Sequence, residues 1–136
     1  MCLALHLITK DSLSESEWVE DAPCLWVKRI RESEEQGELK WNSHAQFVYY
    51  IGGYQGCGCG WSPFREWDEP EEHAQKQADR LSLVQLLQEL SDRSSWMVIC
   101  WEGDQGTELL EPKAIRLDEI KDVGFEFEEK RKYVII

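Results

Sequence analysis

The chain has 136 residues, of which 27 are acidic and 15 basic, so its formal net charge at pH 7 is −12. This length suits one domain with a core of its own, and we expect a single domain over residues 1–136. The negative charge disfavours nucleic acid, whose binding depends on Lys and Arg at the phosphates, and anionic membranes. It favours a basic protein partner, a cation or a metal, and the alternative is that the charge only keeps the protein soluble.

The beginning of the chain gives an expectation about its compartment. The apolar stretch over residues 3–8 is short and lacks a basic leader, and no run approaches the ~20 apolar residues that span a bilayer. We therefore expect a cytoplasmic protein. Thiols stay reduced in that compartment, so the five cysteines need not form disulfides.

Three strands are predicted in the first half of the chain. Residues 2–8 are apolar on both faces, which is typical of a strand inside a sheet. Residues 24–30 form the second predicted strand. Residues 47–51 form the third, because they are aromatic and β-branched.

A helical region follows over residues 71–93, and its two halves place their apolar residues on different faces. Ser82 and Gln85 fit a capping box, which would begin a new helix at that serine. We therefore predict a principal helix over about residues 83–92, with a preceding short or bent helix. One long helix is the alternative.

The C-terminal part is predicted to return to strands. The expected elements are a strand at 96–101, short extended pieces at 109–110 and 114–117, a helical turn at 117–120, an alternating stretch at 125–128 and a strand at 133–136. The repeated βαβ alternation of a parallel sheet is missing. We therefore expect the α+β class, with one mixed or mainly antiparallel sheet and the helices packed on it.

The most distinctive segment is residues 51–61, IGGYQGCGCGW, which holds five glycines and two cysteines directly after the third strand. Glycine tolerates positive φ and lets other groups approach the backbone. Two thiols two residues apart can chelate a metal, form a redox pair or pack as small apolar side chains. We therefore expect any functional site to lie here.

Four blocks of the sequence stand out together: Met1-Cys2 opening a strand, Val48-Tyr49-Tyr50-Ile51-Gly52, Gly56-Cys57-Gly58-Cys59-Gly60-Trp61 and Cys100-Trp101-Glu102-Gly103-Asp104. In these blocks the chain resembles a family of small uncharacterised bacterial proteins. The relatives often carry Phe in place of Trp61. The resemblance implies a single small domain and implies no reaction.

Two functional hypotheses remain open from the sequence. The first is a non-catalytic binding domain, for example an immunity-type inhibitor of a basic protein. Its expected binding loop comprises Gly56, Gly58, Gly60, Trp61, Trp101 and Asp104. Whether the chain is an enzyme is left open, and no catalytic residue is assigned.

The second hypothesis is a thiol site at Cys57 and Cys59. The pair would be a redox couple or half of a zinc site, and no other cofactor is expected. Zinc would need two more ligands. The candidates are His44 and His73, with Cys2, Cys24 and Cys100 as further sources of sulfur.

Overall fold

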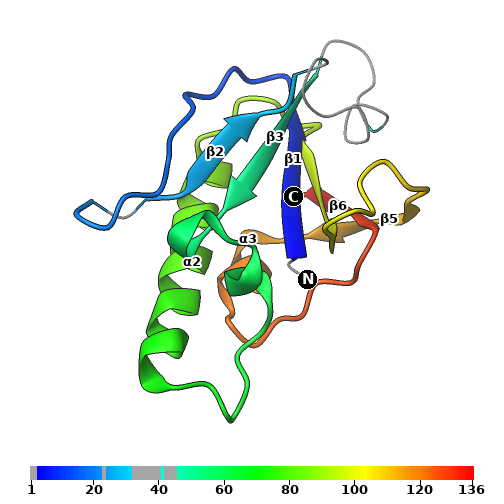
Figure 1. The fold of residues 1–136 in the computed structure, drawn as a ribbon. Coiled ribbons are helices and arrows are strands. Elements are labelled where there is room, and N and C mark those ends of the chain that lie inside the picture. The colour runs from blue at the N-terminus through cyan, green and yellow to red at the C-terminus, as the bar shows by residue number, and fades with distance from the viewer. Residues whose placement is uncertain (1–2, 23, 32–40, 42–45) are drawn as a thin grey trace.

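The computed structural model describes residues 3–22, 24–31, 41 and 46–136, which form a mixed sheet with two helices (Figure 1). The strands are β1 (Leu3–Thr9), β2 (Trp26–Arg29), β3 (Phe47–Gly52), β4 (Trp96–Trp101), β5 (Leu110–Ile115) and β6 (Arg131–Ile135). Their order is β2-β3-β1-β4-β6-β5, and every neighbouring pair is antiparallel except β5 with β6. The predicted α+β class with a single mixed sheet is confirmed.

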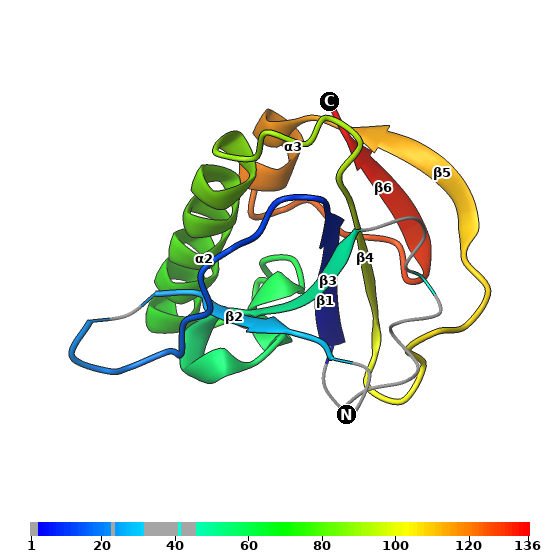
Figure 2. The same cartoon turned by 90° about the horizontal axis from the view of Figure 1, so that it is seen from above.

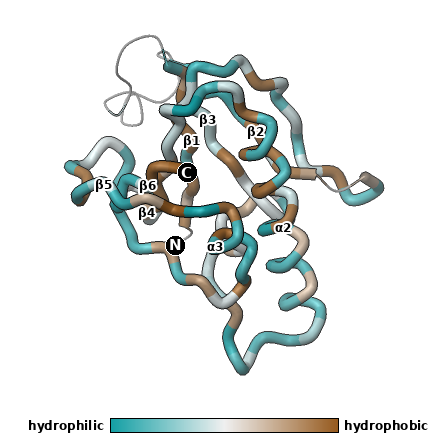
Figure 3. The backbone as a smooth tube through the Cα atoms, turned by 180° about the vertical axis from the view of Figure 1, so that it is seen from behind, coloured by the Kyte–Doolittle hydropathy of each residue, from teal (hydrophilic) through white to brown (hydrophobic). Residues whose placement is uncertain are grey.

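The two helices of the described part, α2 (Pro70–Gln88) and α3 (Leu117–Lys121), lie on the same side of the sheet (Figure 2). Apolar side chains from strands and helices fill the space between them: Leu5, Leu7, Tyr49, Ile51, Leu83, Leu87, Met97, Ile99 and Tyr133. The hydropathy colouring places most hydrophobic segments along the strands and hydrophilic ones on α2 and the connecting loops (Figure 3). Burial of one helix face against the sheet therefore forms the main core.

A second apolar cluster covers the opposite face of the sheet. Its members are Ile8, Ile30, Trp41, Val48, Trp96, Val98 and Cys100, and those that lie on strands alternate with residues of the main core. β1 contributes to both clusters and lies between β3 and β4. The prediction of an interior first strand, apolar on both faces, is confirmed for its described residues.

The predicted division of the helical region at Ser82 is wrong. One continuous helix, α2, runs from Pro70 to Gln88, so the principal helix is neither limited to residues 83–92 nor preceded by a separate one. Ser82 lies inside this helix, and Leu81, the residue before it, is 40% exposed. The alanine, glutamine and lysine residues that precede Ser82 in α2 favour a helix, so the helix continues through the serine. The alternative of one long helix is the observed one.

The other predicted elements are mostly present. The strands at 96–101 and 133–136 appear as β4 and β6, and the helical turn at 117–120 appears as α3. The two extended pieces around Pro112 are one strand, β5, because proline is tolerated at the edge of a sheet. Residues 125–128 are not a strand, although Phe127 is buried and its neighbouring glutamates are exposed as the alternation predicts.

Candidate functional site

Residues 53–61 form a tightly turned loop after β3, called the glycine loop below. It contains two short 3-10 helices, η1 (Tyr54–Gly56) and η2 (Cys59–Trp61). Backbone hydrogen bonds close its turns: Gly53 N–H to Cys57 O (2.9 Å), Gly56 N–H to Gly53 O (2.8 Å), Cys57 N–H to Tyr54 O (3.1 Å) and Trp61 N–H to Gly58 O (3.1 Å). The segment that the sequence singles out is therefore a sharply turned loop closed by its own backbone hydrogen bonds.

Two of the glycines are required by the geometry. Gly56 has a φ of 72°, in the left-handed region that glycine adopts without steric cost. At Gly58, a Cβ atom would lie 1.6 Å from the carbonyl oxygen of Leu3. No side chain fits at that position, so the glycine loop is pressed against the start of β1.

Asp79 of α2 holds the loop from the helix side. Its carboxylate accepts a hydrogen bond from Tyr54 N–H (3.1 Å) and lies within 2.4 Å of where a Cβ would stand on Gly53 or Gly60. Burial raises the pKa of this carboxyl, and the Tyr54 hydrogen bond opposes that rise. Sequence analysis missed Asp79, because only the folded loop brings it to these glycines.

The loop places both sulfur atoms near one point. Cys57 Sγ and Cys59 Sγ are 2.9 Å apart, within hydrogen-bonding distance, and the Cys59 backbone N–H donates to Cys57 Sγ (3.3 Å). Cys59 is exposed and Cys57 is half-buried. The two thiols therefore face a common space that solvent reaches.

A cleft of about 230 Å³ separates the glycine loop from α2 and is called the thiol cleft below. The loop contributes Tyr54, Gln55, Cys57, Cys59 and Gly60, and the helix contributes Glu72, Gln75, Lys76 and Asp79. Any molecule that reaches the sulfurs from this side meets the polar face of α2.

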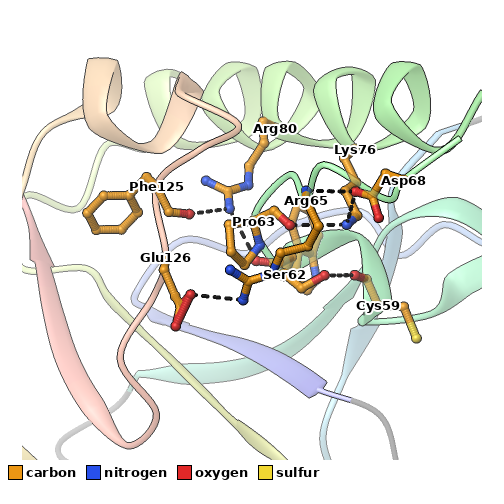
Figure 4. A network of polar contacts seen from close by, with 10 residues as sticks. Cys59, Ser62, Pro63, Arg65, Asp68, Lys76, Arg80, Phe125 and Glu126 are labelled. Atoms are coloured by element: carbon orange, nitrogen blue, oxygen red, sulfur yellow. Dashed lines mark hydrogen bonds and ion pairs between the residues drawn. The ribbon is translucent and has the colours of Figure 1, made fainter. Parts of the chain in front are cut away.

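The end of the loop is anchored in the core. Trp61 is 1% exposed, and its indole N–H donates to the carbonyl of Ile51 (3.1 Å). The guanidinium of Arg80, on α2, is fully buried and donates to four carbonyl oxygens, those of Trp61 (3.2 Å), Ile120 (3.0 Å), Asp122 (3.1 Å) and Phe125 (2.8 Å). Figure 4 shows it reaching from α2 toward the loop and Phe125. Burial lowers the pKa of Arg80 to about 10.

Sequence analysis also missed Arg80, although a signal was present. The arginine is three, four and seven residues before the buried side chains Leu83, Val84 and Leu87, so it lies on the same helix face. A charged residue on the core face of a helix must find partners inside the protein. Its position thus predicts a buried anchor.

Further contacts fix the segment that follows the thiols. The Ser62 hydroxyl donates to the carbonyl of Cys59 (2.8 Å). The Lys76 ammonium donates to Asp68 (2.6 Å) and to the carbonyl of Pro63 (3.1 Å), as Figure 4 shows. Lys76 and Asp68 are both largely buried, and their hydrogen bond lowers the pKa of the Asp68 carboxyl. The loop therefore has fixed supports on both sides of Cys59.

Of the other predicted metal ligands, His73, Cys24 and Cys100 lie in the part of the chain that the structure describes, and their contacts are made elsewhere. The ring of His73 packs against Phe64 with centroids 4.3 Å apart. His73 is not among the described residues that line the thiol cleft. Cys24 donates to Glu17 O (3.3 Å), and Cys100 is buried on the opposite sheet face. His44 and Cys2 lie outside the described residues. Within the described ranges, no group of three or more His, Cys, Asp or Glu side chains is arranged to hold a metal.

The predicted binding-loop residues lie at one end of the sheet. Gly56, Gly58, Gly60 and Trp61 belong to the glycine loop, which contacts Leu3 of β1. Leu3 in turn pairs with Trp101 at the end of β4. Trp101 donates to Glu129, and Asp104 lies 3.9 Å from the ammonium of Lys130, so these two residues are held by the turn before β6.

Comparison of the chain with protein-family models, curated proteins and solved structures finds no match. The resemblance to a bacterial family therefore stays a prediction. Among the residues that the structure describes, no helix is both long and apolar enough to cross a membrane.

Proposed function

We propose that this protein exchanges thiols and disulfides through Cys57 and Cys59, which act as a two-electron redox pair. The observation that carries the proposal is the 2.9 Å separation of the two sulfurs on an anchored loop that solvent reaches. Small side-chain rotations bring such sulfurs to the ~2.05 Å of a disulfide bond. A ring closed across one intervening residue is strained, and strained disulfides are the readily reduced ones.

The different exposure of the two thiols assigns their roles. The thiolate of Cys59, the exposed member, attacks one sulfur of a partner's disulfide and releases one partner thiolate. The thiolate of Cys57 then attacks Cys59 Sγ and releases the second partner thiolate. The protein loses two electrons and two protons as its disulfide forms, and the partner disulfide gains them as it becomes two thiols.

The spacing of the sulfurs favours this chemistry over zinc binding. Two thiolates on one tetrahedral zinc stand roughly 3.8 Å apart, given Zn–S bonds of about 2.3 Å. The observed 2.9 Å lies between that spacing and a disulfide bond. Zinc also needs further ligands, and the described residues offer no group of three.

The test is equilibration of the reduced chain in glutathione buffers of stepped potential, followed by mass spectrometry and peptide mapping. We expect an intramolecular Cys57–Cys59 disulfide. Cys57→Ser should stop at a mixed disulfide on Cys59, and Cys24→Ser, which changes an exposed thiol elsewhere, should behave like wild type. Failure to form the bond at any potential, or oxidation confined to other cysteines, overturns the proposal.

A second function is supported by an exposed aromatic residue. The Trp67 side chain is 79% exposed, and Phe64 nearby is 38% exposed. Exposed tryptophan is typical of binding surfaces, and its ring attracts cations. We therefore also propose that the chain binds a basic protein. Trp67→Ala should weaken capture of a Lys- and Arg-rich partner without changing the fold, and unchanged capture would count against this surface.

A further inference from the structure

The charges around the thiol cleft are unbalanced. Two carboxylates, those of Glu72 and Asp79, line it together with one ammonium, that of Lys76. The ammonium is bound by Asp68 at 2.6 Å, and only 12% of the Lys76 side chain is exposed. A ligand approaching Cys59 therefore meets an excess of negative charge.

The rest of the molecule reinforces this field. The chain carries a net charge of −12, so anions are repelled before they reach the cleft. At low ionic strength such repulsion acts over tens of ångströms. Local and global charge thus favour the same sign of substrate.

An aromatic rim is present beside the cleft. Tyr54 lines the cleft and is 37% exposed, and the ring of Trp18 packs edge-on against it at 5.1 Å between centroids. Exposed aromatic faces attract ammonium and guanidinium groups. The rim therefore favours cations as the charge does.

We propose that the redox pair reacts selectively with cationic disulfides, such as a protein cystine flanked by Lys or Arg, and discriminates against anionic ones. This inference rests on the proposed thiol–disulfide exchange. In this exchange the substrate disulfide is reduced to two thiols while Cys57 and Cys59 form a disulfide bond. The basic partner expected from the net charge would then be the partner of the thiols.

The test compares three small disulfides on the reduced full chain: cystamine (cationic), bis(2-hydroxyethyl) disulfide (neutral) and dithiodiglycolate (anionic). Second-order rates are divided by those of a free dithiol to remove intrinsic reactivity. In about 0.01 M salt we expect cystamine to react about tenfold faster than dithiodiglycolate, since each of the two cleft carboxylates changes the ratio of these two rates by about threefold. In about 1 M salt the preference should fall to about twofold.

A matched pair of variants locates the effect. Glu72→Gln and Glu111→Gln change the net charge equally, but only Glu72 lines the thiol cleft, and Glu111 lies on β5 at the far edge of the sheet. Glu72→Gln should reduce the preference for cystamine by about threefold, and Glu111→Gln should leave it nearly unchanged. Equal effects of the two variants overturn the assignment to the cleft.

The failure of this inference is distinguishable from failure of the proposed function. Equal normalised rates for the three disulfides overturn the charge selectivity while exchange itself persists. No exchange with any of them overturns the redox proposal and the inference with it.

Discussion

The two ends of the glycine loop have opposite environments. At one end, Trp61 is buried and its carbonyl is bound by the buried Arg80. A few residues earlier, Cys59 is exposed and Cys57 is half-buried. A single short loop thus joins the core to a solvent-facing pair of sulfurs.

The comparison shows how an exposed site stays ordered. At the buried end, side-chain N–H groups of Trp61 and Arg80 donate hydrogen bonds to backbone carbonyl oxygens. These acceptors belong to the backbone, so the bonds do not depend on which side chains the accepting residues carry. At the exposed end, glycines allow close approach, the Asp79 carboxylate accepts from Tyr54 N–H, and the Ser62 hydroxyl donates to the Cys59 carbonyl. Changes at the buried end should therefore reduce stability, and changes at the exposed end should alter reactivity.

The largest expected effect is at Arg80. Arg80→Met keeps much of the side-chain length but leaves four carbonyl oxygens without their donor. Because buried acceptors without donors are costly, we expect the free energy of unfolding to fall by about 3–5 kcal/mol. Urea unfolding followed by tryptophan fluorescence measures this loss.

The exposed arginine that follows α2 provides the control. Arg93→Met removes the same charge at the surface and should change the unfolding free energy by less than about 0.5 kcal/mol. If Arg80→Met unfolds the chain outright, Arg80→Lys should give a measurable intermediate stability. Wild-type stability for Arg80→Met would mean that the buried end of the loop does not depend on this anchor.

The next effect concerns the contact between the loop and β1. Gly58→Ala would place a methyl group 1.6 Å from the Leu3 carbonyl, so loop or strand must move. We expect a loss of about 2–4 kcal/mol together with faster alkylation of both thiols by iodoacetamide. Gly124→Ala, where the nearest atom is a side-chain oxygen at 3.3 Å, should be nearly neutral in both measurements. Equal stability of the two variants would contradict the close contact.

The sheet could be predicted from sequence because its strands are marked by local patterns. Residues 47–51 are aromatic or β-branched, residues 96–101 are rich in such side chains, and residues 2–8 are apolar on both faces. Each of these patterns predicts a strand without information on the neighbouring strands. The helix start was misjudged for the same reason. The capping signature at Ser82 can be seen in the local sequence. The contacts of Arg80 in the continuous helix, such as its hydrogen bond to the Trp61 carbonyl, come from residues distant in the sequence and cannot.

The candidate site was predicted only in part. The crowding of glycine and cysteine in residues 51–61 indicated where to look, because glycine permits tight turns and two thiols two residues apart can react together. Asp79 lies in the middle of α2, far from Gly53 in the sequence, so only the fold reveals that contact. The proposed charge selectivity likewise depends on Lys76 binding Asp68 and so leaving the cleft carboxylates unbalanced.

The smallest expected effect, at Asp79, tests whether charge or hydrogen bonding matters at the exposed end. Asp79→Asn keeps an oxygen acceptor for Tyr54 N–H and removes the charge. Burial raises the pKa of Asp79, so the folded chain holds this proton more tightly than the unfolded chain. The stability from this group is present at low pH and is lost as the pH rises through the folded pKa.

Asp79→Asn should therefore match or exceed wild type at pH 7, by no more than about 1 kcal/mol, and this difference should vanish once the pH is well below about 4. Its thiols should be alkylated faster at neutral pH, since thiolate formation no longer faces a neighbouring carboxylate. Asp79→Ala, which removes the acceptor too, should lose about 1–3 kcal/mol. A clear loss of stability in the asparagine variant at pH 7 would mean that the negative charge of Asp79 stabilises the loop. Electrostatic attraction, and not the hydrogen bond to Tyr54 N–H, would then be the main contribution of this residue.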